Sequence, residues 1–176
     1  MKADPSRALL HRAEGLGLEA RAVAGDHAAL KLWLRMLACT TQIEAEIRRR
    51  LRLHFDISLA RFDYLAQLYR YRDGLQMNRL SRHLMVTTGN VTGLTDDLER
   101  AGLVRRDNDP TDRRAWRVSL TELGTRSFEA MAVEHERWIV ELFGGLDAKT
   151  VQQLHQTLGQ LRVQMLPDTR PEETRS

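Results

Sequence analysis

Residues 75–121 constrain the fold more than any other part of the chain. Two short helical patterns joined by a tight turn come first, and two strand patterns joined by a turn-forming segment follow them. Two helices joined by a turn of about three or four residues form the helix-turn-helix pattern. We therefore predict a helix-turn-helix that is followed directly by a small β-hairpin.

The two helical patterns are recognisable by their apolar spacing. The first covers residues 78–85, and Thr87 or Thr88 is expected to cap the second. In the second pattern Val91, Leu94 and Leu98 recur at intervals of three and four, which is typical of one buried helix face. The opposite face is then left free at the start of this helix.

Short polar residues occupy that free face. Short side chains let a helix enter a major groove deeply, and free backbone N–H groups at a helix start favour phosphate. An ordinary helical hairpin, in which Thr and Asn serve only as caps, is the alternative for this segment alone. The residues predicted to face DNA are Thr88, Gly89, Asn90 and Thr92.

A basic hairpin follows the second helix. Gly102 is typical of the position just past a helix C-terminus, and residues 103–106 and 115–120 have strand character. Guanidinium groups on an exposed ribbon suit a narrow minor groove, so the hairpin favours DNA binding over a solvated surface hairpin balanced by aspartates. The arginines of its arms and tip are Arg105, Arg106, Arg113, Arg114 and Arg117.

The hairpin also carries a longer motif. Residues 109–114 read DPTDRR, and residues 118–121 with Gly124 continue as VSLT and G. This motif resembles the wing signature of the MarR family of winged helix regulators. With Leu80-Ser81 through Leu103-Val104, the resemblance covers the whole winged helix and, more loosely, residues 29–162.

The resemblance implies a set of DNA contacts. Asp112 would orient the wing, Arg114 would enter the minor groove, and residues 87–92 would begin the recognition helix. Asp97 departs from the family pattern, because many relatives carry a basic residue there; its carboxylate weakens DNA binding unless Arg100 or another cation pairs with it. The full predicted DNA-binding set is Ser81, Thr87, Thr88, Gly89, Asn90, Thr92, Arg106, Asp112, Arg113 and Arg114.

Amphipathic helices flank this central unit. Residues 27–54 have a broad apolar face, and Trp33 and Met36 are expected to belong mainly to the core. Ser58, Thr121 and Asp147 are expected helix N-caps. After Asp147 a short coiled-coil-like seam, with packing inside one subunit as its alternative, is formed by Val151, Leu154, Leu158 and Leu161.

Together these patterns predict a mainly α fold with a small β-hairpin wing (α+β), a winged helix-turn-helix with N- and C-terminal dimerisation helices. A homodimer would place its two recognition helices about one helical turn apart on a pseudo-palindromic double-stranded operator. The expected organisation is an arm at 1–26, dimerisation helices at 27–56 and 122–163, the winged helix at 57–121 and a flexible tail at 164–176.

The composition bears on the class of protein. The net charge of +3, carried mainly by arginine, is compatible with a nucleic acid partner. The chain has no phosphate loop, serine nucleophile elbow, HExxH or CxxC, so we predict no enzyme, no metal and no cofactor. One cysteine, no apolar run near the roughly 20 residues of a membrane span and no signal-peptide pattern lead us to expect a cytoplasmic bacterial protein, nucleoid-associated when bound to DNA.

Three segments, residues 33–41, 61–68 and 84–94, support a finer resemblance. They are similar to a subgroup that controls aromatic acid catabolism and includes repressors released by hydroxycinnamoyl-CoA thioesters such as p-coumaroyl-CoA. The resemblance implies a repressor of hydroxycinnamate catabolism genes, with a small aromatic effector in a crevice beside the dimer helices. The residues expected there are Trp33, Met36, Leu37, Thr40, Arg48, Phe62, Leu65 and Trp138.

Alternatives to this effector stay open. The arginines within residues 48–52 either seat a phosphorylated carrier or simply interact favourably with a helix C-terminus. A free phenolic acid or oxidation of Cys39 could replace the thioester as the signal. A non-sensing architectural or interaction module would have no crevice. A repressor is favoured over an activator only by the habit of the family.

Overall fold

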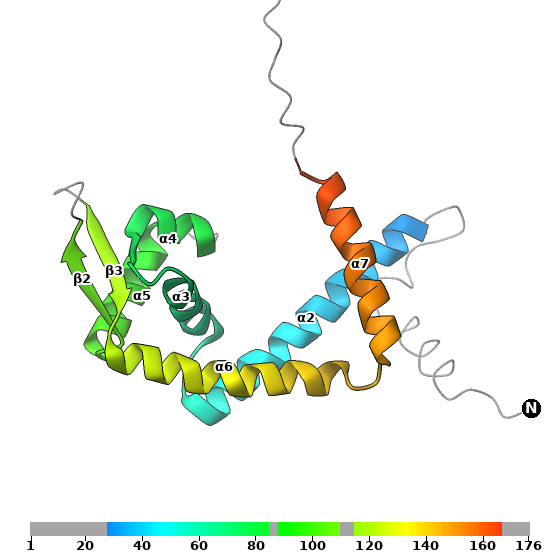
Figure 1. Cartoon of the computed structure of the whole chain (residues 1–176), viewed down its shortest axis with the longest axis horizontal. Coiled ribbons are helices and arrows are strands. Elements are labelled where there is room, and N and C mark those ends of the chain that lie inside the picture. Colours follow the sequence, from blue (N-terminus) through cyan, green and yellow to red (C-terminus); the bar gives the residue numbers. More distant parts are fainter. Residues whose placement is uncertain (1–27, 85–87, 110–114, 167–176) are drawn as a thin grey trace, which may run out of the picture. The chain divides into compact units, whose positions relative to one another are not determined.

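The computed structural model describes residues 28–84, 88–109 and 115–166 (Figure 1). The chain divides into two compact units, residues 1–135 and 136–176. The expected arm at 1–26 and most of the expected tail lie outside the described residues. The elements are α2 (Ala28–Phe55), α3 (Leu59–Arg70), β1 (Leu75–Gln76), α4 (Met77–Leu84), α5 (Thr88–Arg100), β2 (Val104–Asn108), β3 (Trp116–Leu120), α6 (Glu122–Phe143) and α7 (Ala148–Gln164).

Helices dominate, and the described strands form one small antiparallel sheet, which confirms the predicted fold class. The sheet has the order β1-β3-β2. Val118 of β3 lies opposite Leu75 of β1 on one side and Arg106 of β2 on the other. The hairpin of β2 and β3 is the wing, and it follows α5 directly, as the sequence indicates.

The core of the first unit joins α3, α4, α5 and the sheet. Val91 and Leu98 are buried as predicted, whereas Leu94 is half-buried. Burying one such aliphatic side chain stabilises the fold by about 1.5–3 kcal/mol. The residues of this unit that are less than 2% exposed are Leu51, Tyr64, Leu65, Leu68, Leu80, Val91, Thr95, Leu98, Asp109 and Val118.

Local side-chain chemistry sets the helix boundaries, as predicted. Ser58 Oγ accepts a hydrogen bond from the Arg61 N–H at 3.3 Å, and Asp147 Oδ1 accepts one from the Thr150 N–H at 2.7 Å. Thr121 Oγ1 accepts the N–H of Gly124 at 2.9 Å at the start of α6. These side chains satisfy N–H groups that the first helical turn leaves without a partner.

Two glycines are needed where elements meet. Gly102 has φ +71° just after α5, a conformation that suits glycine at a helix end. A Cβ on Gly124 would lie 1.9 Å from the carbonyl oxygen of Leu103, so only glycine allows α6 to start against the beginning of β2. The recognition region and the wing are therefore joined at a tightly built corner.

Two apolar faces are exposed in the single chain. Trp33 is 55% exposed, so its predicted place in the core is wrong for the isolated subunit. Only Ile47 and Leu51 of α2 are buried, and none of the residues of α7 is buried in the described chain. Within the described ranges, no helix is long and apolar enough to cross a membrane.

Candidate nucleic-acid interface

The start of α5 presents short, exposed residues. Gly89, Asn90 and Thr92 are exposed, as predicted. A Cβ placed on Gly89 or Gly93 would meet no atom within 4 Å, so this surface is open. Thr88 begins the helix, whereas Thr87 lies outside the described residues. The first turns of α5 can therefore approach a ligand closely along the backbone.

A buried hydrogen bond holds the second half of α5 against α3. The Thr95 hydroxyl donates to the Val91 carbonyl oxygen at 2.6 Å. Its Oγ1 is also 2.5 Å from the hydroxyl oxygen of Tyr64, which is fully buried. Burial raises the pKa of Tyr64 to about 12, so its hydroxyl stays protonated at neutral pH and is available to donate.

Asp97 is neutralised by two arginines. Arg61 Nη2 of α3 lies 2.5 Å from Asp97 Oδ2, and Arg100 Nη1 lies 3.0 Å from Oδ1. Hydrogen bonding to Arg61, and then to Arg100, holds the pKa of Asp97 below its usual value. We expected Arg100 or another cation to pair with this carboxylate. Arg100 does so, and the second cation is Arg61, which lies 36 residues earlier on α3.

Arg106 ties the wing to α5. Its guanidinium forms ion pairs with Asp96 and with Glu99, whose Oε2 lies 3.2 Å from Arg106 Nε. The Arg106 side chain is only 21% exposed. This arginine was predicted to contact DNA; the structure engages it inside the unit, and a direct DNA contact stays a prediction.

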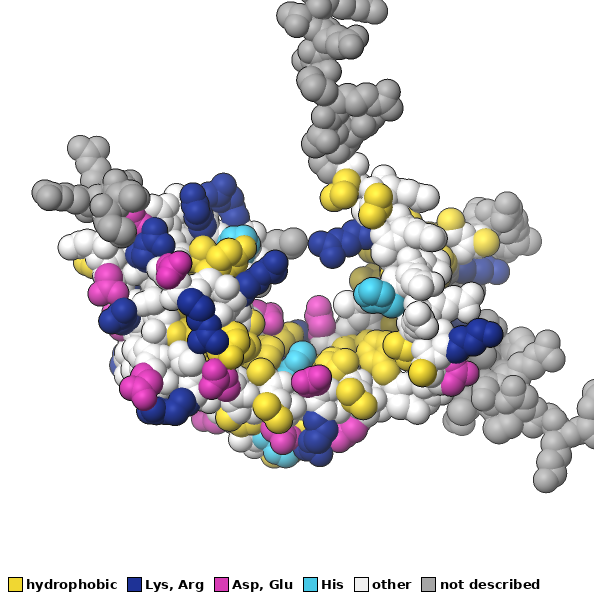
Figure 2. Space-filling view, viewed as in Figure 1, with side chains coloured by type: hydrophobic (Ala, Val, Ile, Leu, Met, Phe, Trp, Pro, Cys, Tyr) yellow, Lys and Arg dark blue, Asp and Glu magenta, His cyan; other side chains and the backbone are white. Residues whose placement is uncertain are grey.

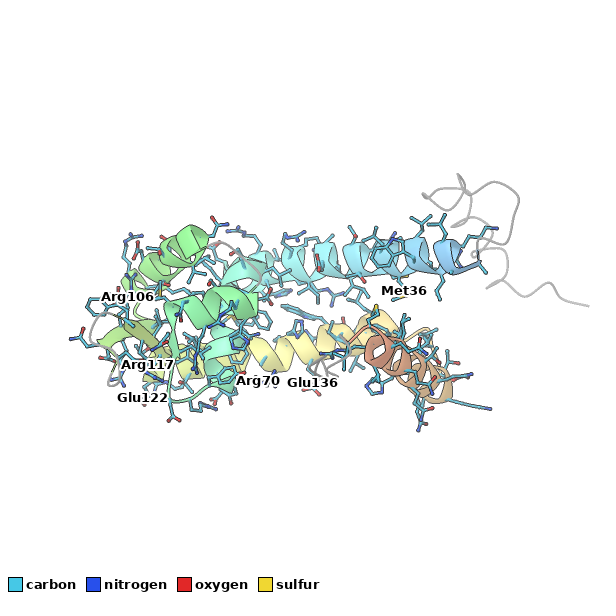
Figure 3. The ribbon with its side chains drawn as sticks, turned by 90° about the horizontal axis from the view of Figure 1, so that it is seen from above. Met36, Arg70, Arg106, Arg117, Glu122 and Glu136 are labelled. Atoms are coloured by element: carbon cyan, nitrogen blue, oxygen red, sulfur yellow. The ribbon has the colours of Figure 1, made fainter. Side chains whose placement is uncertain are left out.

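A second arginine of the wing also serves the fold. Arg117 Nη2 lies 2.9 Å from Oδ2 of Asp109, which is 1% exposed, and Arg117 Nη1 donates to the carbonyl oxygen of Gly74 at 3.1 Å. Figure 3 labels Arg106 and Arg117 on the two wing strands. Both arginines were predicted to be part of the basic hairpin, but the sequence pattern did not show which groups they would pair with inside the protein.

The remaining predicted DNA contacts divide into two groups. Ser81 is buried, and its hydroxyl donates to the carbonyl oxygen of Asn78 at 2.9 Å on its own helix. Asp112, Arg113 and Arg114 lie outside the described residues. Their predicted roles at the wing tip stay predictions.

The outer side of α4 adds basic groups that the sequence showed but that were not assigned to a site. An open recess of about 360 Å³ is lined by Arg79, Arg82 and His83. The His83 ring lies 5.1 Å from the ring of Tyr71. The sequence could have indicated this basic surface, because residues 77–84 contain three basic side chains and no carboxylate.

Known proteins match this chain in sequence and in structure. The MarR family model matches residues 57–116. The uncharacterised HTH-type transcriptional regulator YhbI of Bacillus subtilis is 31% identical over 108 residues, which cover 61% of this chain and 69% of YhbI. A MarR family transcriptional regulator from Silicibacter pomeroyi is 30% identical, with a TM-score of 0.68 over 81% of this chain and 99% of that one. The chain belongs to the MarR family.

Members of the MarR family are DNA-binding transcriptional regulators rather than enzymes. MepR of Staphylococcus aureus, solved as a complex with DNA, is 25% identical and has a TM-score of 0.63 over 76% of this chain and 96% of MepR. The chain spans 60% of the length of B. subtilis YkoM and 43% of Escherichia coli PrsX, two curated regulators that it matches at 32% and 33% identity.

The residues predicted for an effector site of this MarR family protein have different environments. Trp33, Leu37 and Thr40 are exposed on α2 and Met36 is half-buried, whereas Leu65 is wholly buried. Phe62, also buried, lies with its ring 5.5 Å from that of Phe128. Trp138 belongs to the second unit and is 1% exposed.

The arginine cluster at the end of α2 is paired with carboxylates. Glu46 binds Arg49 and Arg50 at 2.8 and 2.7 Å, and hydrogen bonds to these arginines lower the pKa of Glu46 to about 2. Arg48 lies 3.9 Å from Glu44. These pairs favour the interpretation that the cluster stabilises its own helix over the alternative that it seats a phosphorylated ligand. Cys39 is exposed on the same helix.

Proposed function

We propose that this MarR family protein binds a pseudo-palindromic DNA operator as a homodimer and represses transcription. One observation carries the proposal: the first turns of α5 expose short residues, while the second half of the helix is held by α3 and β2. A rigidly held helix with a bare leading end suits insertion into a major groove. The wing would lie in the adjacent minor groove.

The homodimer in this proposal accounts for the exposed apolar faces. The face of α7 includes Leu154 and Leu158, which are 45% and 42% exposed, and Trp33 on α2 is similarly exposed. A helix face with several exposed large apolar side chains is typical of an interface with another protein. A second copy is the partner that also supplies the second DNA-reading head of a two-fold operator.

The effector class in the proposal rests on the sequence segments alone. A hydroxycinnamoyl-CoA thioester would release the operator by binding preferentially to a dimer whose reading heads have a different separation. A free phenolic acid is the competing ligand. The carboxylate partners of the arginine cluster at residues 48–52 give the thioester no added support.

Fluorescence anisotropy on the DNA upstream of the protein's own gene tests the DNA-binding role at fixed salt. Asn90→Ala and Arg114→Ala should each weaken specific binding, because a lost bidentate base contact or groove contact is worth about 1–3 kcal/mol. Thermal unfolding of the same variants controls for loss of fold. Failure of the wild-type protein to bind any upstream fragment specifically would contradict the proposal.

The same assay tests the effector when p-coumaroyl-CoA and free p-coumarate are titrated separately. Release by the thioester alone would support the CoA-sensing repressor. Release by the free acid would assign the site to small phenolic ligands. Binding that is insensitive to both compounds would reject the aromatic effector and leave the DNA-binding role intact.

A further inference from the structure

We infer that the recess on α4 lined by Arg79, Arg82 and His83 binds a backbone phosphate of the operator and supplies a main electrostatic anchor of the DNA-binding unit. This inference rests on the proposed DNA-binding function and adds a site to it. None of these three residues was among the predicted DNA contacts, which lie on the recognition helix and the wing except for Ser81 of α4.

The charge is distributed unequally between the two helices of the helix-turn-helix. Helix α4 carries Arg79, Arg82 and His83 and has no acidic residue. Helix α5 carries three carboxylates, on Asp96, Asp97 and Glu99, against the single guanidinium of Arg100. The recognition helix therefore contributes no net positive charge, and attraction to phosphate must come from its neighbours.

The arginines that adjoin α5 are engaged by its carboxylates. Arg61 and Arg100 pair with Asp97, and Arg106 pairs with Asp96 and Glu99. Their charges mainly offset the acidity of the helix.

The arginines of α4 have a different environment. Among the described residues, neither Arg79 nor Arg82 forms an ion pair with a carboxylate. Arg82 Nε donates to the carbonyl oxygen of Asn78 on its own helix, at 3.3 Å. Both guanidinium groups can therefore meet a phosphate without first breaking an internal ion pair.

The recess also has the geometry of an anion site. Two guanidinium groups present planar sets of N–H donors that match the oxygens of a phosphodiester. The rings of His83 and Tyr71 are in contact, and the Arg70 guanidinium lies 5.9 Å from the centre of the Tyr71 ring, which adds a further cation nearby. Figure 2 shows Lys and Arg side chains gathered over α4.

The position of α4 selects DNA as the source of the phosphate. In a helix-turn-helix the second helix enters the major groove while the first crosses the sugar–phosphate backbone. Helix α4 is that first helix: it ends at Leu84, and α5 begins at Thr88. Phosphate groups of a small molecule such as a coenzyme A thioester have the same chemistry and are the alternative occupant.

The test is the salt dependence of operator binding by the full-length dimer. The double variant Arg79→Gln/Arg82→Gln should bind specific and unrelated DNA more weakly by similar factors, since phosphate contacts carry no sequence information. Each lost contact should reduce the slope of log K against log salt concentration by about 0.9, measured between about 50 and 200 mM salt. The dimer has two such recesses, one on each subunit, so the loss of one phosphate contact from each would flatten the slope by about 1.8.

The matched control is Arg126→Gln/Arg137→Gln, which removes the same charge from α6. Both of these arginines pair with glutamates on their own helix. The control should keep the wild-type slope. An unchanged slope in the α4 variant, with tight binding by the wild type, would overturn the α4 site alone, whereas wild-type protein that binds no DNA would overturn the proposed function and the site together.

Calorimetry with inorganic phosphate and with coenzyme A, in the absence of DNA, distinguishes the two sources of phosphate. Little binding of either compound, with a flattened salt slope in the α4 variant, supports a seat for the DNA backbone. Tight binding of coenzyme A that is lost in Arg79→Gln/Arg82→Gln would overturn this assignment and make the recess a small-molecule site.

Discussion

Helices α5 and α7 follow the same sequence rule and have opposite surroundings. Both repeat apolar residues at intervals of three and four, yet Val91 and Leu98 of α5 are at most 1% exposed, whereas Leu154 and Leu158 of α7 are more than 40% exposed. Helix α5 is covered by α3, α4 and β2 of its own unit. The apolar face of α5 is therefore covered within one chain, while that of α7 is left exposed, and the proposed homodimer would cover it.

We expect the largest effect from substitutions in the exposed apolar face of α7. Leu154→Asp/Leu158→Asp places two charges in the proposed dimer interface, where burying an unpaired charge is strongly unfavourable. We expect a monomer by light scattering and loss of tight operator binding, because a monomer engages only one half-site. The control Gln152→Asp/Gln156→Asp adds the same charge to the opposite face and should stay dimeric. A wild-type monomer would contradict the comparison.

We expect the next largest effect from a cavity in the core beneath α5, which lowers the stability of the fold. Leu98→Ala should lower the free energy of unfolding by about 2–5 kcal/mol, because a fully buried leucine loses its packing and leaves a cavity. Urea denaturation measures the change. Leu53→Ala is a suitable control, since Leu53 is 68% exposed and its replacement should change stability by less than about 0.5 kcal/mol. Equal losses in both variants would argue against a core around α5.

A smaller effect concerns the hydrogen bond that positions α5. Tyr64→Phe removes the hydroxyl that contacts Thr95 and should lower the free energy of unfolding by about 0.5–1.5 kcal/mol. A double-mutant cycle with Thr95→Val isolates the interaction of the two side chains. Additive losses in the two single variants would show that this contact does not hold α5 to α3.

The smallest expected effect compares one carboxylate on α5 with one at the start of α7. The Arg61 guanidinium lowers the pKa of Asp97, whereas the Thr150 N–H lowers the pKa of Asp147. Each lowered pKa stabilises the fold above the unfolded pKa, and this contribution is lost as the pH falls through the folded pKa.

Salt should separate the two carboxylates, because it screens exposed ion pairs. Added salt should therefore move the pKa of Asp97 toward its ordinary value more than that of Asp147. NMR titration of the two carboxyl groups at low and high salt measures the difference. Equal shifts would indicate that Arg61 is not the main cause at Asp97.

Much of the fold could be predicted from local signals. The caps at Ser58, Thr121 and Asp147 and the helix end at Gly102 lie where the sequence indicates. The exposed start of α5 was also predicted, because a buried stripe of Val91 and its helical neighbours leaves only one free face. These features depend on residues within about four positions of one another.

The charged part of the site could not be predicted in the same way. We predicted that Arg106 and Arg117 belong to the exposed basic surface of the hairpin. Their carboxylate partners come close to them only when the wing folds. The burial of Thr95 could not be predicted either, because its partner, the Tyr64 hydroxyl, comes from another helix. Arg79 and Arg82 of α4 could be distinguished from the other arginines only after the structure showed which arginines are paired with carboxylates.

The sequence by itself determined the order of elements, the winged helix-turn-helix and the face of α5 that is exposed, because periodicity and capping are local properties of the chain. Only the tertiary structure decided which arginines are engaged inside the unit and which apolar faces one chain leaves uncovered. Arg61 and Asp97 lie 36 residues apart, and Tyr64 and Thr95 lie 31 apart. Such pairings depend on where whole helices pack, which no local pattern records.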